Sequence, residues 1–293
     1  MNIRTVRKKI KSIKNVKKIT KAMQMVSAVK MRKAQQLELE GRPYRDGLAE
    51  MISTLSTKID PSHSKLLQVD TSHAERELLV IVSSNKGLAG AFNVSLFRKI
   101  LSLYPSFSHV DIVGVGTKGS QFFGRLKDTT IIADFSGNNL ILETSALFDY
   151  LLDQYYTGTY TSVSIVYNEF ISTLRSDQVK KTLLPLTIID SSKTAKDDIK
   201  ESVKGADLII EPSPKEILEE LLKSFIEYTI RGALISSEAV EHSMRMMAMK
   251  SATDNATELI YEMTLLANRL RQEKITNELL DMITAKESVE QKL

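Results

Sequence analysis

The C-terminal part of the chain, residues 213–284, reads SPKEILEELLKSFIEYTIRGALISSEAVEHSMRMMAMKSATDNATELIYEMTLLANRLRQEKITNELLDMIT. After Pro214 it holds no proline and one glycine, Gly232, and residues that favour helices dominate it. Ser213 can cap a helix, Pro214 suits the first helical position, and Glu216 completes a capping box. The stretch therefore predicts one helix of about 70 residues and about 105 Å, too long for a single globular core to bury.

Apolar residues of this stretch recur every three or four positions, at Ala256, Leu259, Met263, Leu266 and Leu270. This spacing is typical of the seam between two paired helices. The predicted helix therefore needs a partner helix, and we expect other subunits to cover the rest of it.

The N-terminal region, residues 2–58, supplies a candidate for the partner helix. Apolar residues step by three and four from Ile3 to Ile13 and again from Val16 to Val26. The step between Ile13 and Val16 is three, which predicts a stammer that overwinds the helix pair. The sequence Gly41-Arg42-Pro43 interrupts the pattern, and Pro43 predicts a kink.

The middle of the chain changes to another period. Continuous apolar, β-branched runs predict buried strands. The expected strands lie at residues 78–84, 110–116, 129–135, 162–170 and 179–188, the last of them at an edge, and the expected helices lie at residues 91–104, after Thr117 and at residues 140–155. Strands that alternate with helices predict a Rossmann-like α/β domain with a mostly parallel sheet.

These regions define the predicted architecture. Residues 1–58 and 212–293 form a long antiparallel two-helix coiled coil, and residues 75–205 form an α/β domain, which we call the foot. With equal rise in both helices, residue 58 lies level with residue 213 and residue 23 with about residue 248. Residues beyond about 271 then project past the N-terminus as a single helix.

Charge is distributed unevenly along the chain. Twelve of the 40 Lys and Arg residues lie in residues 1–37, together with none of the 36 Asp and Glu residues. Lys11, Lys14, Lys18 and Lys21 form a stripe beside the apolar seam. This asymmetry predicts an acidic partner. Nucleic acid is one alternative, although no aromatic residue precedes Tyr44 to stack on bases. A solvated coiled-coil face is another.

Several kinds of site have little support in the composition. The chain has no cysteine, and its four histidines are scattered along the sequence. It therefore has few of the side chains that bind transition metals or exchange protons near neutral pH. No apolar run approaches the ~20 residues that cross a bilayer, and no signal peptide is expected. The turns NKGLAG (residues 85–90) and GVGTKG (residues 114–119) match no phosphate-binding motif. We predict no catalytic residue, cofactor or metal ion.

Several motifs resemble the γ subunit of F-type ATP synthases. They are ITKAMQMV (19–26), KMRKAQ (30–35), SSNKGLAGAFN (83–93), EPSPK (211–215), RMMAMKSATDNA (245–256), RQ (271–272) and ITNE (275–278), followed by Asp281. The family signature usually continues to Gly-Ala, where this chain has Ala285 and Lys286. The resemblance spans the whole chain.

The resemblance implies a non-catalytic central rotor stalk of a proton-translocating ATP synthase. Its expected partners are the α and β subunits, the ε subunit and the c-subunit ring, without nucleic acid, at the cytoplasmic face of a bacterial membrane. The expected contacts with β subunits are made by Met23, Arg271, Gln272, Thr276 and Glu278. The expected seam residues are Met25, Val26, Met246, Met247 and Met249. The alternatives are a coiled-coil adaptor or nucleic-acid tether, and a nucleotide-dependent enzyme.

Overall fold

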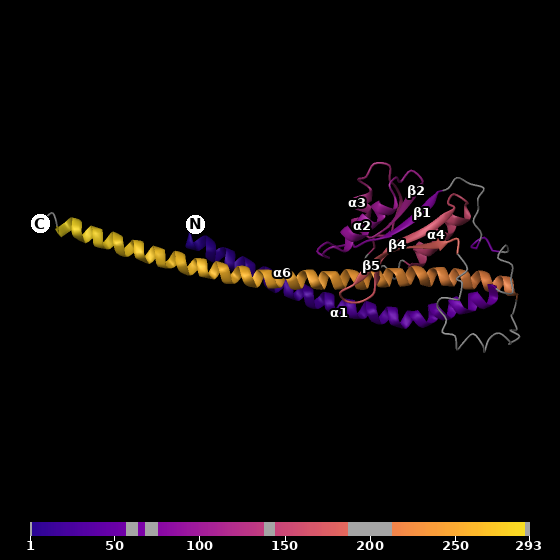
Figure 1. The fold of residues 1–293 in the computed structure, drawn as a ribbon, viewed down its shortest axis with the longest axis horizontal. Helices are drawn as coiled ribbons and strands as arrows, with labels where there is room; N and C mark the ends of the chain where they lie inside the picture. Colours follow the sequence, from indigo (N-terminus) through magenta and orange to yellow (C-terminus); the bar gives the residue numbers. More distant parts are fainter. Residues whose placement is uncertain (1, 57–63, 68–75, 138–143, 187–212, 291–293) are drawn as a thin grey trace. The chain divides into compact units, whose positions relative to one another are not determined.

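A computed structural model describes residues 2–56, 64–67, 76–137, 144–186 and 213–290 of the chain (Figure 1). Its elements are α1 (Ile3–Ser56), β1 (Glu77–Val82), α2 (Phe92–Leu103), β2 (Val110–Val115), α3 (Thr117–Phe123), β3 (Thr130–Asp134), α4 (Thr144–Tyr156), β4 (Ser162–Phe170), β5 (Ser176–Leu184) and α6 (Pro214–Glu290). The chain divides into two compact units. We call residues 1–28 with 245–293 the coiled-coil unit, and residues 29–244 the sheet unit.

The sheet unit holds a five-stranded sheet in the order β3-β2-β1-β4-β5. The first four strands are parallel, and β5 pairs antiparallel with β4 at the edge. The edge strand ends at Leu184, next to Pro185, which lacks the N–H that a ladder needs. The predicted α/β class, the mostly parallel sheet and the edge position of the fifth strand are therefore confirmed.

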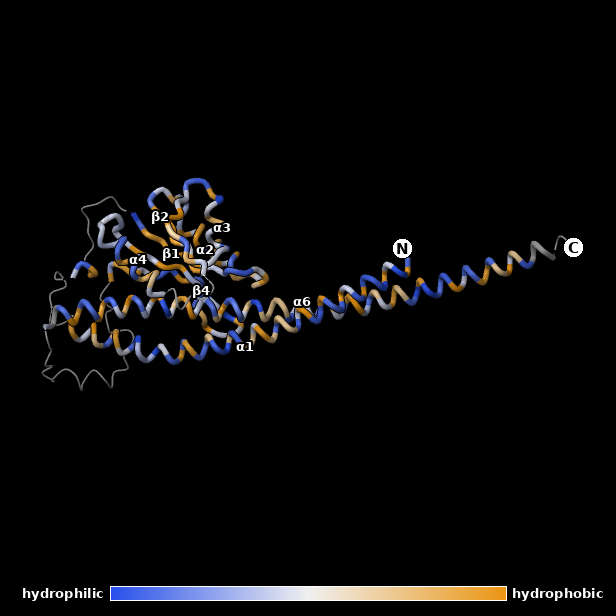
Figure 2. Tube along the Cα trace, turned by 180° about the vertical axis from the view of Figure 1, so that it is seen from behind, coloured by the Kyte–Doolittle hydropathy of each residue, from blue (hydrophilic) through white to orange (hydrophobic). Residues whose placement is uncertain are grey.

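Both faces of the sheet are covered, which explains the continuous apolar runs of its strands. Successive side chains of β1 point to opposite faces. Leu79 and Ile81 pack in one core with residues of α2 and α3, and Leu78 and Val80 pack in the other with residues of α1, α4 and α6. The colouring in Figure 2 shows the apolar character of these central strands. The two long helices thus share the core of the foot.

The two long helices are continuous. The Ser213 hydroxyl accepts a hydrogen bond from the Glu216 amide at 3.3 Å, as the predicted N-cap requires. Helix α1 runs through Pro43 without a break, in agreement with the single helical region predicted for residues 2–58, and the kink at Pro43 stays a prediction. Leu48 and Leu55 are buried in the core of the foot, which anchors α1 beyond the proline.

The register of the helices agrees with the equal-rise prediction. In the sheet unit the ring centroids of Tyr44 and Tyr228 lie 4.4 Å apart. Tyr228 is one residue away from the position that the equal-rise register places level with residue 44. In the coiled-coil unit Thr20 bonds to Thr253, two residues from the predicted level. The helices are antiparallel throughout these contacts. The predicted domain boundaries at residues 58, 75, 205 and 212 fall in or beside segments outside the described residues and stay predictions.

Candidate functional site: a helical pair and its junction with the sheet

The seam of the coiled-coil unit follows an unbroken seven-residue repeat on α1. Its positions, each buried or half-buried, are Ile3, Val6, Ile10, Ile13, Lys17, Thr20, Gln24 and Ser27. On α6 the matching positions are Met249, Thr253, Ala256, Ile260, Met263, Ala267 and Leu270. Spacing of alternately three and four residues keeps each set on one face of its helix. The seam therefore continues without the predicted stammer.

The apolar stripe predicted to continue the seam lies mostly outside it. Val16, Ile19 and Val26 are exposed at 49%, 59% and 57%. Met25 is also exposed, at 57%, and Met23 is half-buried. The sequence prediction followed hydrophobicity, whereas the helix pair keeps its period and buries Lys17, Thr20, Gln24 and Ser27 at least in part. The assignment of Met25 and Val26 to the seam is wrong within this chain.

The α6 side of the prediction has a mixed outcome. Met249 is buried at 5% exposure and lies in the seam. Met246 is half-buried, whereas Met247 and Leu259 are exposed at 40% and 43%. Met247 and Leu259 therefore do not belong to the intramolecular seam. Ile260, the neighbour of Leu259, takes the seam position.

A buried hydrogen bond links the two helices in the middle of this seam. The hydroxyl oxygens of Thr20 and Thr253 lie 2.8 Å apart, and the Thr253 oxygen is also 2.8 Å from the carbonyl oxygen of Met249. Both contacts are satisfied if Thr20 donates to Thr253 and Thr253 donates to Met249. A polar pair that meets inside an apolar seam favours this register, because a shift loses the interhelical bond. Each hydroxyl also has a carbonyl acceptor on its own helix, Lys17 for Thr20 and Met249 for Thr253.

We expect a coupling between the two threonines in a double-mutant cycle. Thr20→Val and Thr253→Val each remove the interhelical bond, so the two losses should not add, with a coupling of about 1 kcal/mol. Denaturant unfolding of the full chain and its three variants measures this. Additive losses would show that the hydroxyls do not act as a pair.

Helix α1 carries an exposed basic stripe and an exposed apolar stripe on different flanks of the seam. Lys11, Lys14, Lys18 and Lys21 are all exposed, so their charges are accessible to another molecule. Val16, Ile19 and Val26, on the other flank, are exposed at 49%, 59% and 57%. An exposed apolar stripe of this kind marks an interaction surface.

Helix α6 continues past the end of the seam. Residues 271–286 are exposed at every position, as the register argument predicted. Arg269 and Lys274 form ion pairs with Glu273 and Glu278, at 3.2 and 3.3 Å. Among the described residues, Arg271 and Gln272 make no side-chain hydrogen bond or ion pair. The Arg271 guanidinium is therefore available to another chain.

The remaining predicted contact residues lie on the same exposed segment. The Thr276 hydroxyl donates to the Gln272 carbonyl oxygen at 3.0 Å, which satisfies it within the helix. Glu278 forms an ion pair with Lys274 at 3.3 Å, in which both side chains are exposed. The structure thus brings Arg271, Gln272, Thr276 and Glu278 together on one projecting helix, while Met23 lies on α1.

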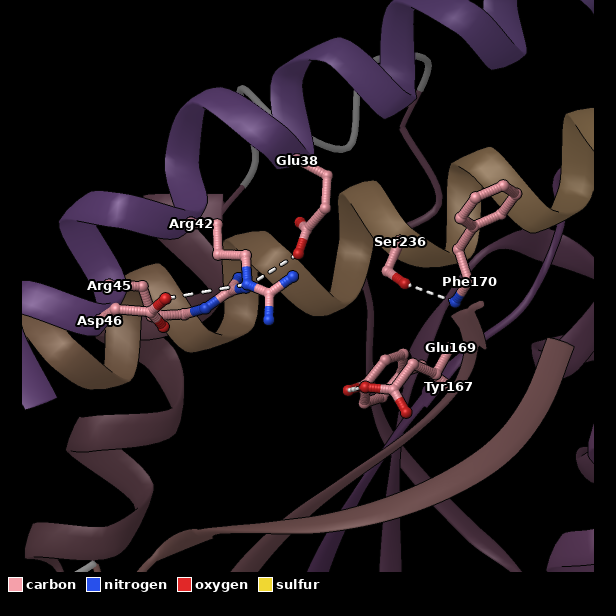
Figure 3. Close-up of polar contacts among 8 residues, drawn as sticks. All are labelled: Glu38, Arg42, Arg45, Asp46, Tyr167, Glu169, Phe170 and Ser236. Atoms are coloured by element: carbon pink, nitrogen blue, oxygen red, sulfur yellow. Dashed lines mark hydrogen bonds and ion pairs between the residues drawn. The ribbon is translucent and has the colours of Figure 1, made fainter. Parts of the chain in front are cut away.

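The sheet is joined to α6 by side chains spaced along that helix. Phe170 donates its amide to the Ser236 hydroxyl at 2.8 Å, as Figure 3 shows, and Ser243 donates to the Thr173 carbonyl oxygen at 2.6 Å. Nearer the start of α6, Ser145 donates to Glu227 at 2.8 Å. These bonds connect α4, the end of β4 and the β4–β5 turn to one helix.

The glycine-rich turns are occupied by the chain's own side chains. The Ser83 hydroxyl donates to the Gly116 carbonyl oxygen at 2.8 Å and accepts a bond from the Gly119 amide at 2.7 Å. Asn85 likewise accepts from the Thr117 amide at 3.0 Å. These are the amides that a phosphate would need. The turn geometry supports close packing of strand and helix rather than nucleotide binding.

The arrangement of side chains in the described part of the chain also bears on metal binding. There, no group of three or more His, Asp or Glu side chains could hold a metal ion. His109 and His242 lie in this part, and His63 and His73 lie outside it. The observed features are instead those of a long helical pair with exposed binding surfaces.

The comparisons with known proteins agree with this geometry. A protein-family model described as ATP synthase matches residues 2–289. The ATP synthase gamma chain of Geobacter sp. (strain M21) is 38% identical over 297 residues, covering 98% of this chain and 99% of the relative. That of Akkermansia muciniphila is 34% identical over 295 residues, covering 99% of each chain.

Solved structures show the same fold. A chain of the mitochondrial ATP synthase of Euglena gracilis, solved as OSCP/F1/c-ring, aligns with a TM-score of 0.63 and 20% identity, over 98% of this chain and 94% of that one. A chain of the Tetrahymena thermophila central stalk/c-ring structure aligns with a TM-score of 0.57 and 24% identity, over 80% and 99%. With sequence matches along its full length and this fold, the chain belongs to the ATP synthase gamma chain family.

Proposed function

We propose that this chain is the non-catalytic central rotor stalk of a proton-translocating F-type ATP synthase. In this role it couples rotation of the membrane c-ring to conformational change in the catalytic β subunits. The observation that carries the proposal is the full-length match to ATP synthase gamma chains. The single helix of residues 271–286, exposed at every position, supports it, because such a helix needs surrounding subunits.

The proposed partners follow from the two ends of the molecule. The helical pair would lie inside a ring of α and β subunits, and the foot would contact the ε subunit and the c-ring. The titles of the Euglena and Tetrahymena structures name F1, a central stalk and a c-ring, which supports this arrangement. Among the described residues, none of the helices has a stretch apolar and long enough to span a bilayer. On its similarity to bacterial ATP synthase gamma chains, we propose that the chain lies at the cytoplasmic face of a bacterial membrane, held there by its partners.

The exposed lysine stripe suggests how the helical pair meets its ring. Lys11, Lys14, Lys18 and Lys21 would face acidic loops of the β subunits. Charge complementarity of this kind guides docking and register more than it raises affinity. The apolar stripe on the other flank of α1, with Val16 and Ile19, would supply buried area against the ring.

Affinity purification from native membranes tests the proposal. A tagged chain should bring down the α, β and ε subunits together with the c-ring, and the purified complex should pump ions when it hydrolyses ATP. Recovery of the chain with nucleic acid, or alone, would contradict the stalk assignment. Salt-dependent binding to DNA or RNA would favour the tether instead.

Met23 provides a second test, at the level of coupling. It is half-buried on α1, in the segment that carries the basic stripe. Met23→Lys adds a further positive charge to residues 1–37, which contain no Asp or Glu. We expect fewer ions to be moved per ATP hydrolysed, with assembly largely retained.

Met23→Leu is the matched control for this substitution. It keeps an apolar side chain of similar volume, so coupling should stay near that of the wild type. If the lysine variant moves as many ions per ATP as the wild type, Met23 does not contact a moving β-subunit loop. Equal losses in both variants would indicate a role in stability alone.

A further inference from the structure

A charged cluster lies where α1, α6 and the β4–β5 hairpin meet in the sheet unit. Arg45 Nη2 lies 2.8 Å from Glu38 Oε1, and the two side chains are 23% and 28% exposed. The residues are seven apart on α1, so the pair spans two turns along one face of the helix. Figure 3 shows this pair between the ribbons of α1 and α6.

Gly232 makes room for this pair on α6. A Cβ atom added there would lie 2.0 Å from Arg45 Nη1 and 3.8 Å from Glu38 Oε2. The guanidinium therefore rests directly against the α6 backbone. Apart from proline, glycine is the residue least favourable to a helix interior, and Gly232 is the one glycine of the 77-residue helix. The contact with Arg45 is a physical reason for its presence.

The hairpin adds the third element. The pKa of Lys181 on β5 is lowered, most strongly by burial and next by the nearby positive charge of Arg45. Burial and the charge of Glu169 raise the pKa of Tyr167 on β4 to about 12, and Arg45 and Glu38 also act on it. Two cations and two carboxylates thus act on one another here, with Arg45 and Glu38 half-buried and Lys181 and Glu169 exposed. The Arg45–Glu38 interaction is therefore screened less than an ion pair at the surface.

A bond on α6 itself lies next to the cluster. Ser236, one turn after Gly232, accepts the amide of Phe170 at the end of β4. Helix α6 is therefore held on one turn by the arginine of α1 and on the next by the last residue of a central strand. The Arg45–Glu38 bond lies within α1, so Arg45 meets α6 by close packing at Gly232. A guanidinium held in place by a charge-assisted bond resists sliding of α6, because a shift would bring a larger residue than Gly232 against it.

From this geometry, we propose that Arg45, accommodated by Gly232, is a positioning residue that locks α1 to α6 at the junction with the sheet. The inference rests on the proposed function: in a rotating stalk, the lock would make both helices turn together with the foot. Without it, α1 would follow α6 through the apolar packing of the foot and through the Thr20–Thr253 bond of the coiled-coil unit. The lock would not touch any catalytic site.

Unfolding of the full chain tests the contact itself. Gly232→Ala adds a better helix former but forces the guanidinium aside, whereas in an Arg45→Ala background it meets no guanidinium. We expect Gly232→Ala to raise the melting temperature more in the Arg45→Ala background than in the wild type. Equal shifts in both backgrounds would overturn the lock.

Gly47→Ala is the matched control for the unfolding experiment. Gly47 also lies inside a helix, and an added Cβ would meet nothing within 4 Å. Its substitution should raise the melting temperature equally with and without Arg45. The cycle needs only the folded chain, so its result does not depend on the rotary function.

The assembled complex tests the mechanical role. With the α and β ring fixed and a probe on the foot, Arg45→Ala should widen the angular fluctuations of the foot and lower the ions moved per ATP. Arg42→Ala, which removes an exposed pair with Asp46 at 3.7 Å, should change neither. Figure 3 shows both pairs.

The outcomes separate the two claims. If the wild-type chain assembles and pumps but Arg45→Ala fluctuates and couples like Arg42→Ala, the lock is wrong and the stalk assignment stands. If the wild-type chain does not assemble with α and β subunits, the proposed function fails. Wider angular fluctuations of the foot in Arg45→Ala but not in Arg42→Ala would support the lock.

Discussion

Replacing Arg271 and Gln272 together with leucine is expected to slow steady-state ATP turnover by the assembled enzyme, while the amount of assembled complex stays unchanged. Both side chains lie on the exposed, projecting part of α6 and make no side-chain bond among the described residues. We propose that they bind a loop of one β subunit in one rotary state. Arginine can offer a carboxylate or carbonyl a forked pair of donors that lysine lacks.

The size of the effect follows from the strength of such a bond. A hydrogen bond to a charged group contributes about 1.5–3 kcal/mol, so loss of one that holds an obligatory state changes a rate by roughly tenfold or more. Turnover measured on purified complex, normalised to the β subunit, checks this. Turnover equal to that of the wild type would show that the contact is absent, and failure to assemble would indicate a packing role.

Arg269→Leu is the matched control for the double variant. It removes an arginine two residues away on the same exposed helix, but one already paired with Glu273 at 3.2 Å. Its side chain is 78% exposed, and an exposed pair of this kind contributes well under 1 kcal/mol. We therefore expect turnover close to that of the wild type.

Gly116→Ala is expected to cause the largest loss of stability. Gly116 has a backbone φ angle of +101°, which residues with a side chain rarely adopt. An added Cβ would lie 2.1 Å from the Ser83 carbonyl oxygen. That oxygen belongs to the backbone beside β1, in the middle of the sheet, and cannot move aside cheaply. The strain and overpacking together should lower the free energy of unfolding by about 3 kcal/mol or more.

Denaturant unfolding of the full chain measures this loss. Gly87→Ala is the control, because Gly87 lies in the other glycine-rich turn and an added Cβ would meet nothing within 4 Å. Its free energy of unfolding should stay within about 1 kcal/mol of the wild type. Equal unfolding midpoints for the two variants would mean that the turn at Gly116 can open to admit a methyl group.

Much of the fold could be predicted from local pattern. The apolar, β-branched runs located β1 to β4, and helix length alone fixed which residues of α1 and α6 meet, to within two positions at Thr20 and Thr253. These features depend on chain geometry that every residue shares. The projection of α6 beyond residue 271 followed from the same count.

The seam could not be assigned by hydrophobicity. Val16 and Ile19 are more apolar than Lys17 and Thr20, yet they are exposed at 49% and 59%. A helix that packs against one partner within its chain and, as proposed, against others outside it carries two apolar stripes. Their composition does not say which partner each stripe meets. Counting sevens without interruption from Val6 would have located Thr20.

The junction around Arg45 was also missed. Its signal in the sequence was Gly232, a lone glycine in an otherwise favourable helix, which indicates a close approach of another group. Which group approaches depends on the register of α1 and on the sheet edge, so it required the three-dimensional structure. The partner contacts of Met23, Thr276 and Glu278 stay predictions.

The unbroken repeat from Ile3 to Ser27 has a mechanical consequence. A seven-residue period is shorter than two turns of a straight helix, so the pair must coil around itself with a left hand. Twisting a left-handed pair in its own sense presses the helices together, and twisting it the other way separates them. A stalk built in this way would be stiffer under one sign of torque than under the other. ATP synthesis, driven from the foot, and ATP hydrolysis, driven from the ring in the reverse direction, would twist the stalk in the same sense, so both would load the same side of this asymmetry.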